Sequence, residues 1–158
     1  MAAAPMPIRV YADTSVFGGC FDEGFIDHSR AFFADVRSGR FRLVTSAVVE
    51  QELILAPPHV RRLFDEMADV ADRRPVSGEA IRLQQAYLDA GVVGAGQMAD
   101  ALHVAVATAS VCPIIVSWNF KHIVRFDKIP RYNAVNVQQG FGPILIHSPS
   151  EVSGGQEE

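Results

Sequence analysis

The sequence is poor in cysteine and has no long apolar run. Cys20 and Cys112 are its only two cysteines, and their spacing fits no paired metal-ligand motif. Two such thiols indicate reduced, packed side chains rather than a disulfide scaffold. Polar residues such as Asp100 and Asn119 interrupt the apolar stretches before they reach the roughly 18 to 20 residues of a membrane-spanning helix. We therefore expect a protein that neither depends on disulfides nor crosses a membrane.

Several signatures of enzyme classes are also missing. The sequence contains no G-x-S-x-G motif of esterases, no P-loop lysine motif of NTPases and no C-x-x-C pair of zinc sites. Residues 1–7 have neither the basic start nor the apolar core of a signal peptide, so we expect a cytoplasmic protein. The net charge of −4 disfavours a general polyanion binder, but the basic segment 121–131 can still face phosphates.

Strand-like and helix-like segments alternate along the chain, which is typical of an α/β fold. A chain of 158 residues with 49% hydrophobic residues has the size and apolar content of one domain. The patterns predict strands at 8–12, 41–44, 114–116, 133–137 and 144–146, and helices at 24–38, 46–56, 59–71, 78–90 and 97–110. Such alternation predicts a central parallel sheet flanked by helices on both faces. The domain spans residues 7–150, and residues 151–158 are expected to form a flexible C-terminal tail.

Three acidic residues fall where such a fold gathers its ligands. Asp13 ends the first predicted strand, Glu50 lies in the helix after the second strand, and Asp100 lies in the first turn of the apolar helix 97–110. Ligands of parallel α/β sheets collect at the carboxyl ends of the strands, so the three acids can meet there. They have no basic partner close in sequence, and a divalent cation would compensate buried carboxylates. Oxygen ligands of this kind suit Mg²⁺ or Mn²⁺.

Each acid alone has a simpler explanation. Asp13 can be the N-cap of a helix, Asp100 is favoured by the helix dipole, and Glu50 can be a surface residue. His103 lies one turn after Asp100, and we expect it to be a buried, hydrogen-bonded helix residue rather than a metal ligand. Only the combination of the three acids favours a metal site.

Four segments resemble the four motif blocks of the PIN-domain nuclease family, in the family's order and spacing. The segments are YADTSVF (11–17), VVEQEL (48–53), DALHVA (100–105) and IVSWNF (115–120). The resemblance covers residues 7–150 and implies a divalent-metal-dependent endoribonuclease in which Asp13, Glu50 and Asp100 bind Mg²⁺ or Mn²⁺. It also implies a VapC-like toxin, with RNA as substrate, an antitoxin protein as partner and a homodimer as assembly.

One position departs from the family pattern. Many members have an aspartate where this chain has Asn119, and an amide adds no negative charge for a second metal ion. We still expect Asn119 and Ser117 to orient water or substrate, and Lys121 and Arg125 to contact RNA phosphates. The departure keeps a second hypothesis open, namely a catalytically weak or inactive PIN-like module that binds RNA or a protein without cutting.

One other motif suggests different chemistry. Residues 94–99, GAGQMA, match the G-x-G-x-x-A pattern of dinucleotide-binding loops and open a helix. However, a helix rather than a strand precedes them, and the next strand ends without the acid that binds the ribose. We therefore interpret this segment as a flexible entry into helix 97–110.

Overall fold

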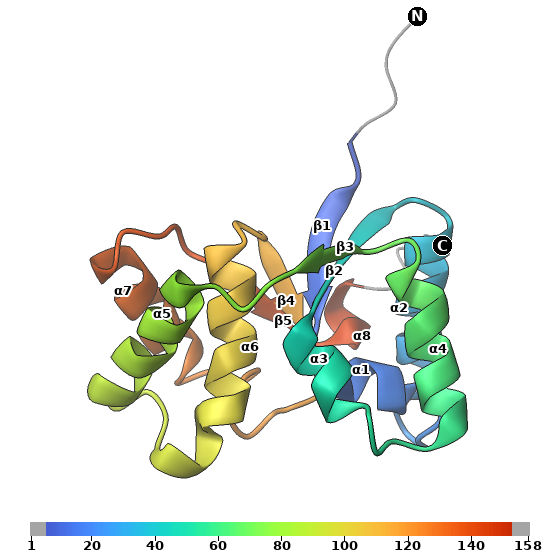
Figure 1. Ribbon diagram of the computed structural model, residues 1–158, viewed down its shortest axis with the longest axis horizontal. Helices are drawn as coiled ribbons and strands as arrows, with labels where there is room; N and C mark the ends of the chain where they lie inside the picture. The colour runs from blue at the N-terminus through green and yellow to red at the C-terminus, as the bar shows by residue number, and fades with distance from the viewer. Residues whose placement is uncertain (1–5, 153–158) are drawn as a thin grey trace, which may run out of the picture.

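Five parallel strands form the centre of the molecule, in the order β3-β2-β1-β4-β5, with helices on both sides (Figure 1). The structure is a computed structural model and describes residues 6–152. The strands are β1 (Ile8–Ala12), β2 (Phe41–Ser46), β3 (Asp72–Arg74), β4 (Ile114–Val116) and β5 (Leu145–His147). The helices are α1 (Thr14–Gly19), α2 (Ile26–Arg37), α3 (Ala47–Glu52), α4 (Pro58–Ala68), α5 (Gly78–Asp89), α6 (Met98–Ala109), α7 (Ile129–Gln138) and α8 (Pro149–Val152), with a 3-10 turn, η1 (Ala95–Gln97), before α6. The expected α/β fold with a parallel central sheet is confirmed.

The strand β1 lies at the centre of the sheet, because it pairs with β2 on one side and with β4 on the other. Val10, Tyr11 and Ala12 have no exposed surface. The first two residues of β1, Ile8 and Arg9, are still partly exposed, but this buried second half, covered on both faces and along both edges, has no room for a charge. Asp13 is the first residue beyond the end of the strand, which places its carboxylate at the carboxyl edge of the sheet.

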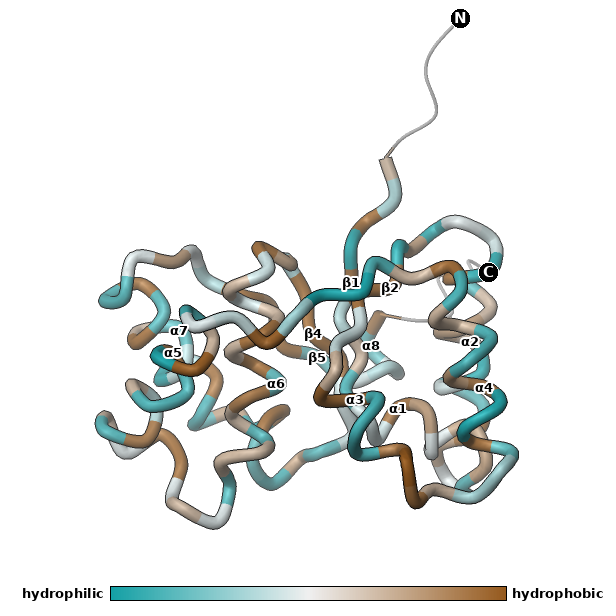
Figure 2. Tube along the Cα trace, in the orientation of Figure 1, coloured by the Kyte–Doolittle hydropathy of each residue, from teal (hydrophilic) through white to brown (hydrophobic). Residues whose placement is uncertain are grey.

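The helices form one layer on each face of the sheet (Figure 1). The helices α5, α6 and α7 pack together on one face, and α1, α2, α4 and α8 cover the other. In α6 the segment 104–107 is fully buried, and its small valine and alanine side chains let the helix approach its neighbours closely. The opposite layer packs larger rings, with Phe17 4.9 Å from Phe33 and 5.5 Å from Phe64 between centroids. In Figure 2 polar and apolar residues alternate along α4, as expected for a helix with one face in the core.

Most predicted elements appear within a few residues of their expected bounds, but the predicted strand at 133–137 is wrong. This segment belongs to α7, in which Tyr132, Val135 and Asn136 are buried at helical spacing. Pro130 stands in the first turn of the helix, where its fixed backbone angle is favourable. Five residues are too few to distinguish a strand from part of a helix. The spacing of the buried residues over the whole of α7 is helical.

Two elements were missing from the sequence interpretation. The short edge strand β3 consists of Asp, Arg and Arg, a composition that carries no strand signal, and it forms by pairing with the end of β2. The helix α1 covers Gly18 and Gly19, which suggested a loop. Gly19 is buried, and a Cβ atom at this position would lie 2.5 Å from Ser29 Oγ and 2.7 Å from Trp118 Nε1. The glycine therefore permits a close approach between α1, α2 and the loop after β4.

This close approach makes Gly19→Ala a destabilising substitution, although alanine favours a helix. We expect it to lower the free energy of unfolding by about 1 to 3 kcal/mol, because the new methyl group must displace the packed Ser29 and Trp118 side chains. The matched control is Gly18→Ala, whose Cβ would meet only an Asp22 oxygen at 4.0 Å and should be neutral or stabilising by up to about 1 kcal/mol. Urea unfolding of both variants measures the difference, and equal midpoints would contradict the packing argument.

The last described helix, α8, packs against α2. The short helix α8 includes Glu151 and Val152, which the sequence analysis assigned to the tail, and Arg40 donates a hydrogen bond of 3.1 Å to the Val152 carbonyl. Residues 153–158, the remainder of the expected tail, lie outside the described part of the chain. Within residues 6–152 no helix has both the length and the apolar character needed to cross a membrane.

Candidate functional site

Asp13 lies where β1 and β4 end side by side. Its backbone N–H donates to the Val116 carbonyl at 3.2 Å, which extends the sheet by one residue. Its carboxylate caps α1, because Oδ1 accepts hydrogen bonds from the Ser15 backbone N–H at 3.1 Å and from Ser15 Oγ at 2.6 Å. The Ser117 hydroxyl donates to the other oxygen, Oδ2, at 2.7 Å. Asp13 is therefore both the N-cap of α1 and a residue at the carboxyl edge of the sheet, as the sequence analysis suggested.

Burial controls the charge of Asp13, which is only 4% exposed. Loss of solvent raises the pKa of its carboxyl group, and the nearby charge of His103 and the hydrogen bonds from Ser117 and Ser15 lower it without cancelling the rise. A cation placed against Oδ2 would favour the ionised form. The site thus holds a carboxylate that gains from a positive ligand.

His103 lies at the centre of the acidic residues and is 2% exposed. It belongs to α6, and its Nδ1 lies 2.8 Å from the Tyr11 hydroxyl oxygen while its Nε2 lies 2.8 Å from Glu52 Oε1. The expectation of a buried, hydrogen-bonded helix histidine is confirmed. Tyr11 was absent from the sequence-based site, because a tyrosine inside a buried strand gives no sign of a polar contact across the core.

Three carboxylates affect the pKa of His103. Burial lowers this pKa, but the hydrogen bond that His103 Nε2 shares with Glu52 Oε1 and the negative charges of Asp13, Glu52 and Asp100 together raise it above the ordinary value. Three carboxylates therefore act on one imidazole. The sequence analysis found no basic partner for the acids, and the fold supplies one from within α6.

The second acid of the group is Glu52 rather than Glu50. Glu52 is the last residue of α3, and its Oε1 accepts hydrogen bonds from His103 Nε2 and from the Thr14 hydroxyl. Burial raises the pKa of Glu52, but the hydrogen bond and charge of His103 and the bond from Thr14 lower it below the ordinary value. Both donors contact Oε1, which leaves Oε2 for a ligand.

Glu50 lies apart from this group. It is exposed and forms an ion pair of 2.6 Å with Arg73, so the structure does not bring it to Asp13 as the sequence analysis expected. Residues two positions apart in a helix point in different directions, and Glu52 lies one turn beyond the buried Val49. Glu52 lies three positions after Val49 and so on nearly the same side of the helix. This spacing from a buried residue could have identified Glu52 from the sequence.

Asp100 lies in the first turn of α6, one turn before His103, and is partly exposed. Its charge also acts on Lys128 and on Tyr132, both from the segment that leads into and through α7. Asp100 therefore faces the space between the start of α6 and this basic segment. Asp13, Glu52 and Asp100 thus lie at the same edge of the sheet, near enough for their charges to act on His103, and Glu52 is the one of the three that is hydrogen-bonded to it.

The loop after β4 is built by Ser117 and Asn119. Ser117 Oγ donates to Asp13 and accepts from the Asn119 backbone N–H at 2.9 Å. The Asn119 side-chain oxygen accepts hydrogen bonds from the backbone N–H groups of Lys121 at 3.2 Å and His122 at 2.9 Å. Asn119 is therefore a turn cap, and only its amide NH₂ remains to serve the predicted contact with water or substrate.

Trp118 ties this loop to both α1 and α2. Its backbone N–H donates to Ser15 Oγ at 2.9 Å, and its indole N–H donates to Ser29 Oγ at 2.8 Å. The Phe25 ring stacks on the indole with centroids 4.5 Å apart. Ser15 also bonds Asp13, so the tryptophan is one hydrogen-bonded residue away from the acid.

The two basic residues predicted to contact RNA lie on the same loop. Lys121 is exposed, and Arg125 forms an ion pair of 2.7 Å with Asp127 while it also donates to the Lys121 carbonyl. The aspartate offsets part of the arginine charge. Both side chains lie after the carboxyl end of β4, and their contact with phosphate stays a prediction.

The oxygen atoms at this edge fit a water-rich divalent ion better than a closed cage. Across residues 6–152, no three His, Cys, Asp or Glu side chains lie close enough together to hold a metal ion. Mg²⁺ typically keeps several waters and needs only one or two protein carboxylates. Asp13 Oδ2, Glu52 Oε2 and the Asp100 carboxylate are hard oxygen donors of the required kind.

A groove of about 440 Å³ gives solvent access to Glu52. It is lined by Ala47, Val48, Gln51, Glu52, Val76 and Leu102, so its walls come from α3, from the segment before α5 and from α6. Apolar walls with one carboxylate are typical of a site that orients a ligand through few polar contacts. Glu52 is therefore reachable from outside through this groove.

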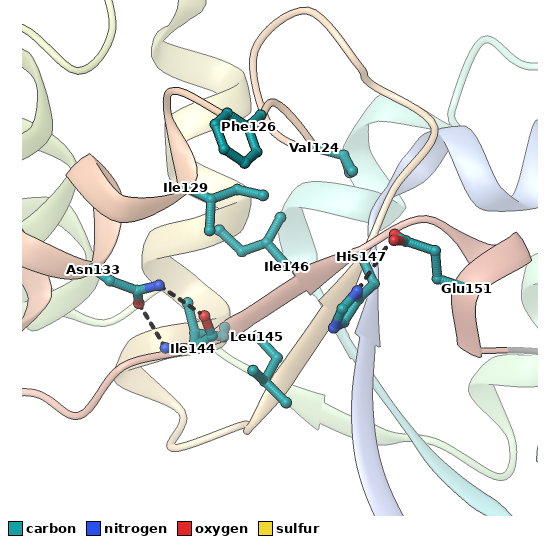
Figure 3. Close-up of a pocket in the computed structure, with 9 residues that line it drawn as sticks. All are labelled: Val124, Phe126, Ile129, Asn133, Ile144, Leu145, Ile146, His147 and Glu151. Atoms are coloured by element: carbon teal, nitrogen blue, oxygen red, sulfur yellow. Dashed lines mark hydrogen bonds and ion pairs between the residues drawn. The ribbon is translucent and has the colours of Figure 1, made fainter.

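A second groove, of about 380 Å³, lies beside the edge strand β5 (Figure 3). The polar groups in it are already engaged, since Asn133 bonds the backbone of Ile144 and His147 lies 3.3 Å from Glu151. The remaining lining is largely apolar and includes Val124, Phe126, Ile129, Leu145 and Ile146. None of the three clustered acids lines this groove, so it is separate from the candidate site.

Comparison with known proteins places the fold. No family model matches the sequence, and no curated protein matches it. Among solved structures, VapBC2 from Rickettsia felis bound to a DNA fragment from its promoter matches with a TM-score of 0.59 and 13% identity, over 89% of this chain and 98% of that chain. The chain has a PIN-like fold.

Two further structures support this assignment. FitAcB from Neisseria gonorrhoeae matches with a TM-score of 0.55 and 12% identity, over 90% of this chain and 99% of that chain. FitAB bound to an IR36 DNA fragment matches with a TM-score of 0.54 and 12% identity, over 93% and 99%. The resemblance carried by the four motifs is thereby confirmed as a likeness of fold.

The pair of His103 and Glu52 should make the stability of the PIN-like fold depend on pH. A raised histidine pKa stabilises the fold fully below the ordinary value of 6.5 and loses this effect as the pH rises through the folded-state pKa. A lowered glutamate pKa stabilises the fold above the ordinary value of 4.5 and loses this effect as the pH falls. The contribution of the pair should therefore be largest between pH 4.5 and 6.5.

Urea unfolding of the wild type and of His103→Leu across pH 4 to 9 measures this contribution as the difference between their free energies of unfolding. We expect the difference to be greatest in the stated window and to shrink on both sides of it. A difference that does not change with pH would mean that the pair is not ionised in the folded protein.

Proposed function

We propose that this protein is a divalent-metal-dependent endoribonuclease of the PIN type and the toxin component of a toxin–antitoxin pair. The observation that carries the proposal is the buried Asp13 carboxylate, fixed by Ser15 and Ser117 at the carboxyl edge of the sheet, with Glu52 and Asp100 at the same edge. The PIN-like fold and the four sequence motifs support it. A phosphodiester is the substrate class for which an acidic, oxygen-only metal site is suited.

In this proposal Asp13, Asp100 and Glu52 would hold a water-rich Mg²⁺ or Mn²⁺ ion, in part through its bound waters, because no three such side chains of residues 6–152 lie close enough to hold it directly. A bound divalent ion would supply Lewis acidity and lower the pKa of a water for attack on the phosphodiester. Asp13 is held in one orientation by Ser15 and Ser117, so its Oδ2 has a fixed direction. Fixed ligands reduce the reorganisation that accompanies the reaction.

The loop after β4 would bind the RNA strand. Lys121 is exposed and free to contact a phosphate, whereas Arg125 must exchange its ion pair with Asp127 for the substrate. The Asn119 NH₂ group can donate to a substrate oxygen while its own oxygen holds the turn. Ser117 contributes by orienting Asp13.

The structural comparison supports one of the proposed partners. VapBC2 and FitAB are two-component complexes with PIN-like chains, which supports an antitoxin protein as partner of this chain. We extend the proposal to a cytoplasmic homodimer that a cognate antitoxin inhibits. An antitoxin can inhibit by covering the acids or by placing a basic side chain among them.

Asn119 favours a second candidate function. Its side-chain oxygen is committed to the turn, and it brings no negative charge to the site. A PIN-like module with weak or no activity, which binds RNA or a protein, would have the same fold. Cleavage assays separate the two candidates.

The first test is cleavage of end-labelled RNA by purified, antitoxin-free protein with Mn²⁺. EDTA should abolish cutting, and Asp13→Asn and Asp100→Asn should each lower the rate by at least about 100-fold, because loss of a ligand charge weakens stabilisation by several kcal/mol. Circular dichroism controls for folding. If the folded wild type cuts none of several RNAs, the binding module is the better assignment.

The second test compares two glutamates of the same helix. Glu52→Gln should lower the cleavage rate by at least about 10-fold, because Oε2 would no longer carry charge to the ion. Glu50→Gln removes only an exposed ion pair with Arg73 and should stay within about twofold of the wild type. The opposite ranking would restore Glu50 as the acid that the motif suggested.

A further inference from the structure

A chain of hydrogen bonds leads from the core to Glu52. Ser46 Oγ lies 2.8 Å from the Tyr11 hydroxyl, this hydroxyl lies 2.8 Å from His103 Nδ1, and His103 Nε2 lies 2.8 Å from Glu52 Oε1. Ser46, Tyr11 and His103 are at most 3% exposed. The four residues come from the end of β2, from β1, from α6 and from α3. Four elements of the fold therefore converge on one carboxylate.

The chemistry of the partners fixes the direction of the last bond. An ionised carboxylate can only accept hydrogen bonds, so His103 Nε2 carries the proton and donates it to Glu52 Oε1. Tyr11 can donate to Nδ1 of a neutral ring or accept from a charged one, and Ser46 adapts its hydroxyl in either case. The bond to Glu52 is the same in both states.

A second donor acts on the same atom of Glu52. The Thr14 hydroxyl, one residue after Asp13, also donates to Oε1. Two donors on one oxygen restrict the side chain to one orientation, in which the other oxygen, Oε2, has neither of them as partner. A glutamate normally loses rotamer freedom when it binds a ligand, and here the fold has already removed much of that freedom.

We propose that His103, oriented by Tyr11, is a positioning residue that holds Glu52 so that Oε2 alone binds the divalent cation. The inference rests on the proposed function, in which Glu52 is a ligand of that ion. It adds two buried residues, Tyr11 and His103, that never touch the ion or the RNA. Outer hydrogen-bond partners of this kind change metal affinity without contacting the metal.

Isothermal titration of the purified full chain with Mn²⁺, without RNA, tests this role. His103→Leu should raise the Kd for Mn²⁺ by about 10- to 100-fold, because Glu52 loses the donor that orients it. His103→Gln should recover most of the affinity, because the glutamine amide can donate from near the position of Nε2. The matched control is His147→Leu, which breaks another His–Glu pair, with Glu151, and should leave the Kd within about twofold.

A measurement on the wild type keeps the test independent of how the variants fold. In a long-range ¹H–¹⁵N spectrum His103 Nε2 should carry a proton, and addition of Mg²⁺ should shift its resonance because Oε2 of the same carboxylate then binds the ion. Tyr11→Phe should weaken Mn²⁺ binding by less than His103→Leu, because the imidazole loses an orienting partner but keeps its donor.

The outcomes separate this inference from the proposed function. A folded His103→Leu variant with the wild-type Kd, or an unprotonated Nε2, overturns the positioning role while metal-dependent cleavage by the wild type still stands. Equal losses in His103→Leu and His103→Gln would show that packing, and not the donor, is responsible. A wild type that binds no Mn²⁺ overturns the positioning role and the proposed function together.

Discussion

The structure depends on the burial of the Asp13 carboxylate at the end of the central strand. β1 is covered on both faces and both edges, so the first charge after it lies in a nearly dry environment. Its compensation comes from Ser15 in α1, from Ser117 after β4 and from the charge of His103 in α6. These contacts join both helical layers to the sheet at one point. A misplaced α1 or α6 would remove part of this compensation, and the fold is therefore strictly specified at the carboxyl edge of its sheet.

The electrostatics of the acids and of His103 belong together. The negative charges of Asp13, Glu52 and Asp100 raise the pKa of His103 against the effect of its burial. Burial raises the pKa of Asp13, the most buried of these acids, whereas the contacts of Glu52 with His103 and Thr14 lower the pKa of Glu52. Similar carboxyl groups at one edge of the sheet are therefore shifted in opposite directions by their surroundings.

Much of the fold could be predicted from periodicity, because long amphipathic or fully apolar segments have few alternatives. The strands β1 and β4 and the helix α6 are examples, and their ends placed Asp13 and Asp100 correctly at the carboxyl edge. The rest required three-dimensional contacts. His103 meets Glu52 and Tyr11 across 51 and 92 residues of sequence, and no local pattern encodes such pairs.

The choice between neighbouring acids shows the same limit at short range. The motif VVEQEL contains Glu50 and Glu52, and only the phase of a six-residue helix against the core distinguishes them. Short elements have weak phase signals, because one or two buried residues define their inner face. The same weakness explains why the six-residue helix α1 was missed.

Trp118 is the only tryptophan in the chain, and its surroundings make it an optical probe of the site. Its indole is held by Ser29 and stacked on Phe25, while its backbone is bonded to the serine that caps Asp13. The Asp13 carboxylate is linked to this residue by two routes, through Ser15 and through Ser117, which directly precedes Trp118 in the chain. Tryptophan fluorescence therefore comes from one location, where a single serine hydroxyl bonds both the Trp118 backbone and the Asp13 carboxylate. The protein thus carries its own label for changes at the carboxyl edge of its sheet.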